Sequence, residues 1–323
     1  MNISYLGNFH DAHSTEGQIA RAFERLGHTV IRLGVRDHDH DSVVAAVKAS
    51  QPEVLLGAKW GFRGADGAWP DAANPVAALI AECRPHVGKV VCLHWDCVNP
   101  EFSPARFTWQ QIVSEACDLT ALTDGSVASQ LPRVIVLRDG APDDVDLSCE
   151  SAEKVNAACF TGTLYGRRQE WAAVMRARLG ARFVHVGPGG DGYEPLGVPS
   201  NTEIRGPELT PLVRSFRLCV QPPWPAFDGY ASDRVIVTRA HGGLLVSPEL
   251  RGYGDDLEPW RHYITVPSEP RSYAAKVAEL LDSYDAATLD RIRRNGEEHA
   301  RARPWEVRCR KLIELLLELG VTS

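Results

Sequence analysis

Two stretches of the sequence begin in the same way: ISYLGNFHDAHSTEGQIARAFERLGHTV (residues 3–30) and AACFTGTLYGRRQEWAAVMRARLGARFVHV (residues 157–186). Each reads as a short apolar strand, a turn that contains glycine, an amphipathic helix and a second apolar strand. Parallel strands need a crossover connection of this kind. Two such beginnings predict two doubly wound α/β domains. Because doubly wound sheets bind ligands at the carboxyl ends of their strands, we expect the site between the two halves.

The size and composition agree with two globular domains. The chain has 323 residues, of which 44% are hydrophobic and 24% are charged, so each half can bury a core. A net charge of −7 argues against a general nucleic-acid binder, which usually carries a basic domain. The N-terminus shows no signal peptide, and no apolar run is long enough to span a membrane. The eight cysteines lack zinc or redox spacing, so we expect a cytoplasmic protein with reduced cysteines.

The pattern of apolar and polar residues predicts alternating strands and helices in both halves. Ser14 is expected to cap a helix over residues 16–26 that Gly27 ends. The acidic, turn-rich stretch 142–154 is interpreted as a linker. The predicted domains therefore cover residues 1–150 and 151–304, and residues 305–323 contain a last amphipathic helix.

The strongest candidate for a ligand site is the stretch PPWPAFDGYASDRVIVTRAHGGLLVSPE (222–249). It contains a loop and the first turn of a helix, where backbone N–H groups and a forked guanidinium attract an anion such as a diphosphate. Two later glycines allow the backbone to approach a ligand or a neighbouring strand. An ordinary turn between a helix and a strand explains the pattern about equally well. The residues concerned are Asp228, Ser232, Asp233, Arg234, Gly242 and Gly243.

A second candidate is the stretch FTGTLYGRR (160–168). Gly162 and Thr163 follow a predicted strand, and a turn without a bulky side chain can approach phosphate oxygens. Arg167 and Arg168 stand at the start of the next helix, where a positive charge opposes the helix dipole. An anionic ligand would offset this repulsion, so we favour a ligand contact for at least one of them over two solvated arginines.

The order of these segments resembles that of the retaining GT-B glycosyltransferases, especially the group that contains the CgeB-like spore-maturation proteins. The resemblance covers nearly the whole chain and implies the GT-B fold, in which two Rossmann-like domains face a central cleft. It also implies that the last helix, residues 305–323, crosses back to the N-terminal domain. The segments that carry it are STEGQIARAFERLGHTV (14–30), KVVCLHWDCVNP (89–100), CDLTALTDGS (117–126), RVIVLRDGAP (133–142), FTGTLYGRR (160–168), IRGPELTPLVRSFRLCVQP (204–222) and YASDRVIVTRAHGGLL (230–245).

The resemblance implies roles at matching positions. The N-terminal domain would lie on the acceptor side, and its loop from Gly7 to Ser14 would face the donor diphosphate and the acceptor. His94 would lie near the transferred sugar. The C-terminal domain would bind the nucleotide sugar. Its implied donor contacts are Arg168 or Arg167 for the diphosphate, residues 204–207 with Arg205 for the base, and Ser232 to Arg234 for the phosphate and the sugar.

The chain departs from the family in its paired-glutamate motif. Asp228 stands near the first acidic position and is a candidate catalytic residue. The second glutamate, which typically holds the ribose, falls on Val237, and a valine accepts no hydrogen bond. The ribose contact must therefore come from elsewhere, such as Asp233 or Glu249, or the choice of donor is unusual.

The resemblance also implies the reaction. A hexosyl or pentosyl group would pass from a UDP- or GDP-sugar to an acceptor hydroxyl with retention of configuration. Positive groups would stabilise the leaving diphosphate as its charge develops. Because arginines and helix termini can neutralise that charge, we expect neither a metal nor another cofactor.

Candidates for the acceptor side lie in two loops of the N-terminal half. His13 follows the first predicted strand and is a candidate to orient an acceptor hydroxyl, although a capping role explains it nearly as well. The stretch KWGFRGADGAW (59–69) is aromatic and basic and could stack on a sugar or an extruded base. Packing within the loop explains it slightly better. The weaker acceptor candidates are His10, Asp11, Trp60, Phe62 and Arg63.

The sequence leaves the acceptor open among a small molecule, a glycan, a protein and a hydroxymethylated pyrimidine in DNA. The net acidity weighs against DNA, and the loop at residues 59–69 weighs mildly for it. Two alternatives have the same fold but transfer no sugar: a non-catalytic nucleotide-sugar-binding protein and a sugar-nucleotide epimerase.

Overall fold

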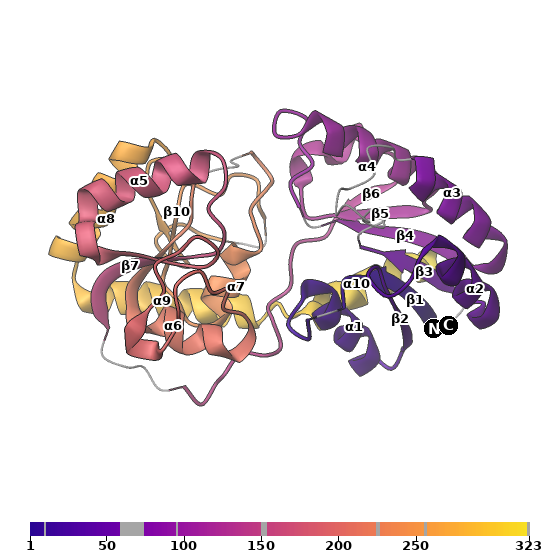
Figure 1. Cartoon of the computed structure of the whole chain (residues 1–323), viewed down its shortest axis with the longest axis horizontal. Coiled ribbons are helices and arrows are strands. Elements are labelled where there is room, and N and C mark those ends of the chain that lie inside the picture. Colours follow the sequence, from indigo (N-terminus) through magenta and orange to yellow (C-terminus); the bar gives the residue numbers. More distant parts are fainter. Residues whose placement is uncertain are drawn as a thin grey trace. The chain divides into compact units, whose positions relative to one another are not determined.

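The computed structural model describes residues 1–9, 11–58, 74–94, 96–149, 154–223, 227–254 and 257–321. The chain divides into two compact units. The first comprises Met1–Gly140 and Trp305–Ser323, and the second comprises Ala141–Pro304 (Figure 1). The second unit is therefore one continuous segment, whereas the first is built from two segments.

In its described part, the first unit contains one parallel sheet with the strand order β2-β1-β3-β4-β5-β6. Helices cover both faces of this sheet. Its elements are β1 (Asn2–Gly7), α1 (Thr15–Arg25), β2 (Thr29–Gly34), α2 (His40–Ser50), β3 (Val54–Gly57), α3 (Asn74–Cys83), β4 (Lys89–His94), α4 (Pro104–Ala116), β5 (Leu119–Leu122), β6 (Val134–Val136) and α10 (Trp305–Glu318), with short 3-10 turns at Arg84–His86 and Gly125–Gln130.

Alternation along the strands fills two cores, one on each face of this sheet. In β3, Val54 and Leu56 join the core under α1 and α10, whereas Leu55 joins the core under α2, α3 and α4. This period of two is expected for strands buried on both faces. Helix α10 thus completes the first unit, where Trp305 and Leu312 are among its buried residues.

The second unit repeats the design with a parallel sheet of strand order β11-β10-β9-β7-β8, as far as the described residues show. Helices α5, α8 and α9 enclose one core, and α6 encloses another on the opposite face. The elements are β7 (Val155–Thr161), α5 (Arg167–Leu179), β8 (Phe183–Val186), α6 (Leu209–Ser215), β9 (Phe216–Val220), α7 (Arg234–Ala240), β10 (Leu245–Ser247), β11 (Ile264–Thr265), α8 (Pro270–Ser283) and α9 (Ala286–Arg301), with 3-10 turns at Gly180–Arg182, Glu194–Leu196 and Gly206–Glu208.

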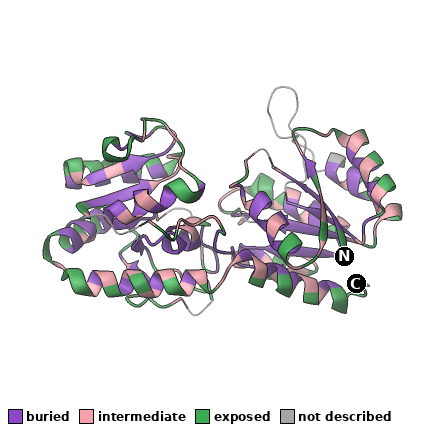
Figure 2. Cartoon of the chain, turned by 90° about the horizontal axis from the view of Figure 1, so that it is seen from below, coloured by how far each residue is buried: buried purple, intermediate pink, exposed green. Residues whose placement is uncertain are grey.

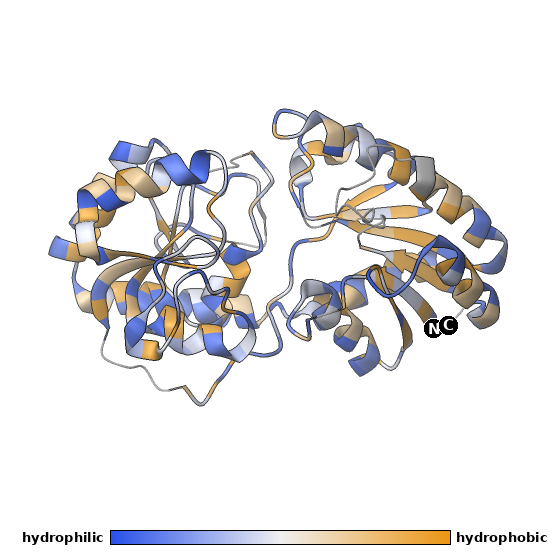
Figure 3. Ribbon diagram, viewed as in Figure 1, coloured by the Kyte–Doolittle hydropathy of each residue, from blue (hydrophilic) through white to orange (hydrophobic). Residues whose placement is uncertain are grey.

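Burial and hydropathy follow this architecture. The strands of each unit are mostly buried and apolar, while many outward positions of the helices are exposed and hydrophilic (Figures 2 and 3). No described helix is long and apolar enough to cross a membrane. Seven of the eight cysteines are buried, and none of the eight forms a disulfide.

Two features of the predicted organisation can be compared with the structure. Ser14 caps α1 as expected, because its side chain accepts a hydrogen bond from the Gly17 N–H at 3.1 Å. The stretch interpreted as a linker differs. Its residues 142–149 belong to the second unit, where the backbone N–H of Asp146 donates to Thr210 Oγ1 at 3.2 Å. The acidic, turn-rich residues 142–149 are therefore part of the second unit and do not form a separate linker.

Candidate functional site

Two arginines lie together where β7 ends and where α5 and α7 begin. Arg168 is in the first turn of α5 and is only 3% exposed. It shares the buried face of that helix with Trp171 and Met175, which stand three and seven residues further on. Arg234 is the first residue of α7. The pair therefore stands at the carboxyl edge of the sheet of the second unit.

Arg234 is fixed by the main chain at the end of β7. Its Nε donates a hydrogen bond to the carbonyl oxygen of Thr161 at 2.9 Å, and its guanidinium lies 5.8 Å from the ring centre of Phe160. A β-carbon on Gly162, whose φ is +126°, would come within 2.5 Å of Arg234 Nη2. Because Gly162 has no side chain, the Arg234 guanidinium can lie directly against this turn. Within the described part of the chain, Arg234 forms no ion pair.

The same turn is held by the neighbouring strand β8. The Nε2 atom of His185 lies 2.6 Å from the carbonyl oxygen of Gly162, and its ring stacks on Phe160 at 5.3 Å. Burial lowers the pKa of His185, so the imidazole is neutral and can donate from Nε2. A β-carbon on Gly187 would come within 2.4 Å of the Gly162 carbonyl oxygen. The ends of β7 and β8 therefore approach closely.

The electrostatics of this arrangement favour a negative ligand. Burial lowers the pKa of Arg168, and the positive charge of Arg234 lowers it further. Three groups act in the opposite direction: the Tyr165 ring, whose centre lies 4.2 Å from the Arg168 guanidinium, Tyr230 and the carboxylate of Asp233. Their effect is smaller than that of burial and of Arg234, because the pKa of Arg168 is lowered overall. Two forked guanidinium groups can hold phosphate oxygens with charge-assisted hydrogen bonds. The site can thus bind a phosphate or diphosphate.

A pocket of about 430 Å³ opens at the same edge of the sheet, at the ends of β9, β10 and β11. Asp228 and Ser232, both predicted site residues, line it together with Ser247, Glu249 and Arg251. The residues that line this pocket include neither Arg168 nor Arg234. The arginine pair, at the starts of α5 and α7, and the pocket, which the loop before α7 lines, are therefore separate parts of this edge. In the described ranges, no three or more His, Cys, Asp and Glu side chains form a group that could hold a metal ion.

The predicted residues of the first unit lie at the carboxyl ends of two of its strands. Gly7 ends β1, and the loop that follows is shaped by Asp11, whose Oδ1 accepts a hydrogen bond from the His13 N–H at 2.8 Å. His94 ends β4, and its ring centre lies 6.0 Å from that of Trp109. The other acceptor candidates, His10, Trp60, Phe62 and Arg63, lie outside the described residues.

Gly242 and Gly243, predicted in the donor site, lie away from the other donor candidates. Helix α7 runs back from the carboxyl edge, so the glycines after it stand before the amino end of β10. A β-carbon on Gly242 would come within 2.7 Å of Arg214 Nε, and one on Gly243 within 2.9 Å of Thr238 Cγ2. These glycines therefore permit close packing at the amino edge, which is the alternative that the sequence pattern left open.

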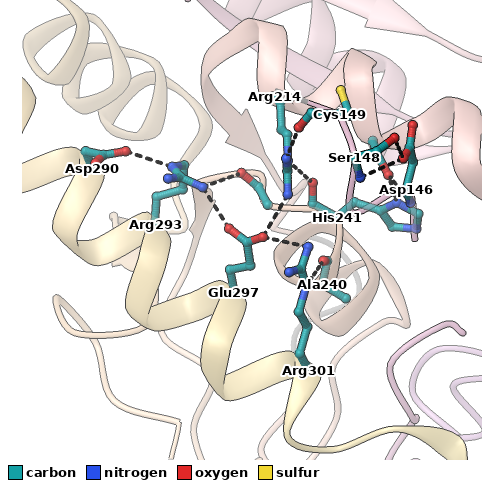
Figure 4. Close-up of polar contacts among 12 residues, drawn as sticks. Asp146, Ser148, Cys149, Arg214, Ala240, His241, Asp290, Arg293, Glu297 and Arg301 are labelled. Carbon is teal, nitrogen blue, oxygen red and sulfur yellow. Dashed lines mark hydrogen bonds and ion pairs between the residues drawn. The ribbon is translucent and has the colours of Figure 1, made fainter. Parts of the chain in front are cut away.

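A network of charges surrounds that end of α7 (Figure 4). Glu297 of α9 forms ion pairs with Arg214 at 2.8 Å, with Arg293 at 2.8 Å and with Arg301 at 2.6 Å. Arg214 also donates to the carbonyl oxygen of His241 at 3.2 Å. Positive side chains at a helix C-terminus interact favourably with its carbonyl groups, so this network stabilises the second unit.

The remaining donor candidates are dispersed in the second unit. Arg167 is exposed, while its neighbour Arg168 is buried beside Arg234. Arg205 is exposed and pairs with Glu203 at 2.8 Å. Val237 is half-buried and packs against two apolar clusters. Thr163, which follows β7, is half-buried. Asp233 is exposed, and its carboxylate accepts a hydrogen bond from the Arg234 N–H.

Three further residues at this edge were not among the predicted site residues. His185 holds the Gly162 turn, and Ser247 and Arg251 line the pocket. Ser247 is the last residue of β10. For Ser247 the sequence did contain a signal, since a polar residue at the carboxyl end of a buried strand often contacts a ligand. For Arg251 the sequence contained no such signal.

The comparisons with known proteins support the fold. No protein-family model matches the chain, and no curated protein matches it. Among solved structures, a sucrose-phosphate synthase from Thermosynechococcus elongatus is 13% identical, with 100% of both chains covered and a TM-score of 0.68. HepE of Anabaena, in complex with UDP-glucose, is 14% identical over 98% of this chain and 100% of that one, with a TM-score of 0.65. An alpha-glucosyltransferase in complex with UDP-glucose and DNA is 11% identical over 98% and 99%, with a TM-score of 0.66.

The fold is GT-B. This confirms the predicted fold class of two Rossmann-like α/β domains. The GT-B neighbours match over nearly their whole length, so both units take part in the likeness. At 11–14% identity the likeness concerns the fold, and the activity has to be argued from the site.

Proposed function

We propose that this chain is a glycosyltransferase that moves a sugar from a nucleotide-diphosphate sugar, UDP- or GDP-linked, to an acceptor hydroxyl. The observation that carries the proposal is the arginine pair at the carboxyl edge of the second unit, within a GT-B fold. Arg168 is buried beside a second cation, and the guanidinium of Arg234 forms no ion pair among the described residues. Two GT-B neighbours were solved with UDP-glucose, which supports a diphosphate as the missing anion.

The chemistry follows from the charge of the leaving group. As the bond between the sugar and the diphosphate breaks, negative charge develops on the departing phosphate oxygen. Guanidinium groups that are already held in place stabilise that charge without reorganisation. The turn at Gly162 supports such preorganisation, because the Thr161 carbonyl oxygen holds Arg234 and His185 holds the carbonyl oxygen of Gly162.

The other predicted residues enter the proposal with the same roles. Gly162, Thr163 and Arg167 would approach the diphosphate with the arginine pair. His94, Asp228 and His13 would act at the transferred sugar and the acceptor hydroxyl. Retention of configuration is proposed from the family resemblance, and the anomeric proton of the product in an NMR spectrum tests it. The further donor residues proposed are Gly7, Ser14, Arg205, Ser232 and Asp233.

The charge distribution bears on the acceptor. The first unit has 15 Lys and Arg against 19 Asp and Glu, and the second has 20 against 23. Neither unit is therefore basic, whereas proteins that hold DNA by its phosphates usually are. We propose a small molecule, a glycan or a protein as the acceptor. Modified DNA is the second candidate acceptor, because one structural neighbour was solved with DNA. An affinity of this chain for DNA that falls steeply as the salt concentration rises would favour that acceptor.

The decisive experiment measures donor binding and turnover together. Calorimetry with UDP, GDP, ADP and TDP and their common sugars should show micromolar to millimolar binding of one nucleotide. Release of that nucleotide from its sugar should then be observed in the presence of acceptors. Binding without release would favour the non-catalytic nucleotide-sugar-binding alternative. Release of an epimerised sugar would favour an epimerase, and no binding at all would overturn the proposal.

A further inference from the structure

The pocket at the ends of β9, β10 and β11 has the size of a small-molecule site. Its volume of about 430 Å³ lies within the range of about 300–1,000 Å³ that is usual for ligand pockets. Its walls are fixed by a buried tyrosine. The hydroxyl of Tyr273, on α8, lies 2.9 Å from the carbonyl oxygen of Gln221 and 3.0 Å from that of Val246. The ends of β9 and β10 are thus tied together, and the pocket is preformed.

One polar group of a residue that lines this pocket has no hydrogen-bond partner in the described part of the chain. The side-chain oxygen of Ser247 is buried, with the residue 1% exposed, and it forms no hydrogen bond with a described residue. A buried hydroxyl without a partner is unfavourable. Its neighbour Ser232 differs, because Gln221 Nε2 donates to it at 2.9 Å. Ser247, a residue that lines the pocket, therefore carries a buried hydroxyl whose hydrogen-bonding capacity is unused among the described residues.

The remaining polar residues of the wall suit a ligand with many hydroxyl groups. Asp228 and Glu249 offer carboxylate oxygens, which accept hydrogen bonds. Arg251, 2.8 Å from Glu249, balances one of the two negative charges. Phe227 and Tyr230 add aromatic rings, which pack against the C–H groups of a sugar ring.

The charges also argue for a neutral ligand. Two carboxylates and one guanidinium make this wall net negative, which disfavours a phosphate or a carboxylate. The arginine pair that suits a diphosphate is absent from the lining residues. A metal ion is not favoured either, since the described part of the chain groups no three metal-ligating side chains.

We propose that this pocket binds a neutral saccharide that is not attached to a nucleotide, with Ser247, Asp228 and Glu249 as hydrogen-bonding partners of its hydroxyl groups. The proposal goes beyond the proposed function, because the pocket would bind such a sugar even if the chain transferred none. If the chain does transfer sugars, the ligand is an acceptor saccharide held on the second unit.

The test uses saturation-transfer NMR on the full chain with glucose, galactose, mannose, maltose, sucrose and trehalose as probes. Thermal shift is unsuitable here, because sugars stabilise proteins by exclusion from their surface. We expect saturation transfer to at least one sugar. No transfer to any of the six would overturn the proposal.

A matched pair of serine variants tests the location. Ser247→Ala removes a hydroxyl that has no hydrogen-bond partner among the residues that the structure describes, so the melting temperature should not fall, while the affinity for the sugar should fall about 3- to 10-fold. Ser215→Ala removes a hydroxyl that donates to the Pro211 carbonyl oxygen at 2.7 Å and lies outside the pocket. It should lower the melting temperature and leave sugar binding unchanged. Equal sugar affinity in Ser247→Ala and the parent chain would overturn the assignment.

Competition separates this site from the donor site. Saturating UDP or UDP-glucose should leave the saccharide signals in place. Displacement by UDP-glucose but not by UDP would mean that the pocket holds the sugar of the donor, which overturns a separate site. Saccharide signals in a chain that binds no nucleotide would support this inference while the proposed function fails.

Discussion

The two ends of α7 carry arginines in opposite circumstances. At its C-terminal end, Arg214 and Arg301 donate to the carbonyl oxygens of His241 and Ala240, and both pair with Glu297 (Figure 4). At its N-terminal end, Arg234 lies beside the positive Arg168 and has no ion pair among the described residues.

The difference between the two ends of α7 indicates how an arginine that stabilises the fold can be distinguished from one that binds a ligand. Buried charges that hold a fold together are paired within the protein. Charges that wait for a ligand are left with positive neighbours. We therefore expect substitutions at the C-terminal end of α7 to change stability, and substitutions at its N-terminal end to change binding.

The largest effect is expected from Glu297→Ala. This change leaves Arg214 and Arg293, whose side chains are 12% and 14% exposed, without their shared carboxylate. Breaking a buried ion pair on one side typically lowers the free energy of unfolding by about 3–5 kcal/mol, and denaturant titration measures it. Glu279→Ala is the control, because that carboxylate is 51% exposed and, among the described residues, forms an ion pair with Lys276 alone. If both variants lose less than about 1 kcal/mol, the network does not stabilise the unit.

The next effect is a pH dependence from His241. Burial lowers its pKa to about 4, and the charges of Arg301 and Arg214 add to this. Its unfolded pKa is about 6.5, so the unfolded chain binds a proton between those values and the folded chain does not. The stabilisation is complete above pH 6.5 and is lost as the pH falls towards 4, by up to about 3 kcal/mol. Unfolding at pH 7 and pH 4.5 should show a smaller difference in His241→Gln than in the parent chain, and equal differences would contradict this assignment.

A smaller effect, on binding alone, is expected from Arg168→Met. Removing one of two neighbouring cations relieves their repulsion, which offsets the loss of the Arg168 contacts with the Thr163 carbonyl oxygen and the Tyr165 ring. The free energy of unfolding without ligand should therefore change little. The affinity for UDP or GDP should fall about 10- to 100-fold, since a hydrogen bond to a charged group contributes about 1.5–3 kcal/mol. Calorimetry measures both nucleotides, with Arg167→Met as the exposed neighbour. A large loss of stability in Arg168→Met would place this arginine with the structural charges and would remove the contrast between the two ends.

The fold was predictable because its signals are local. The strand–helix–strand pattern at the start of each half predicts a doubly wound sheet. The helix cap formed by Ser14 also involves residues within four positions of one another. The burial of Arg168, and not of Arg167, was also predictable from the sequence, since Arg168 continues the spacing of the apolar residues Trp171 and Met175 along the helix. The predicted roles in the site remain proposals, because no ligand contact follows from local pattern.

Other parts of the site depend on the path of the chain in space. Gly242 is eight residues from Arg234 in the sequence, yet α7 carries it to the opposite edge of the sheet. The pocket gathers the ends of three strands, and Glu249 and Arg251 meet Asp228 there only after the sheet has formed. Sequence spacing does not report such long-range neighbours.

Helix α10 has a consequence for the order in which the protein is made. The second unit, Ala141–Pro304, lies between the two segments of the first. During synthesis a ribosome releases all of that unit before Trp305, Cys309, Leu312 and Leu316 emerge to cover the older sheet. Domains usually mature from the N-terminus onward. The first unit, although it is translated first, is therefore completed last. Until α10 emerges, only α1 covers the face of its sheet that both helices share in the finished protein.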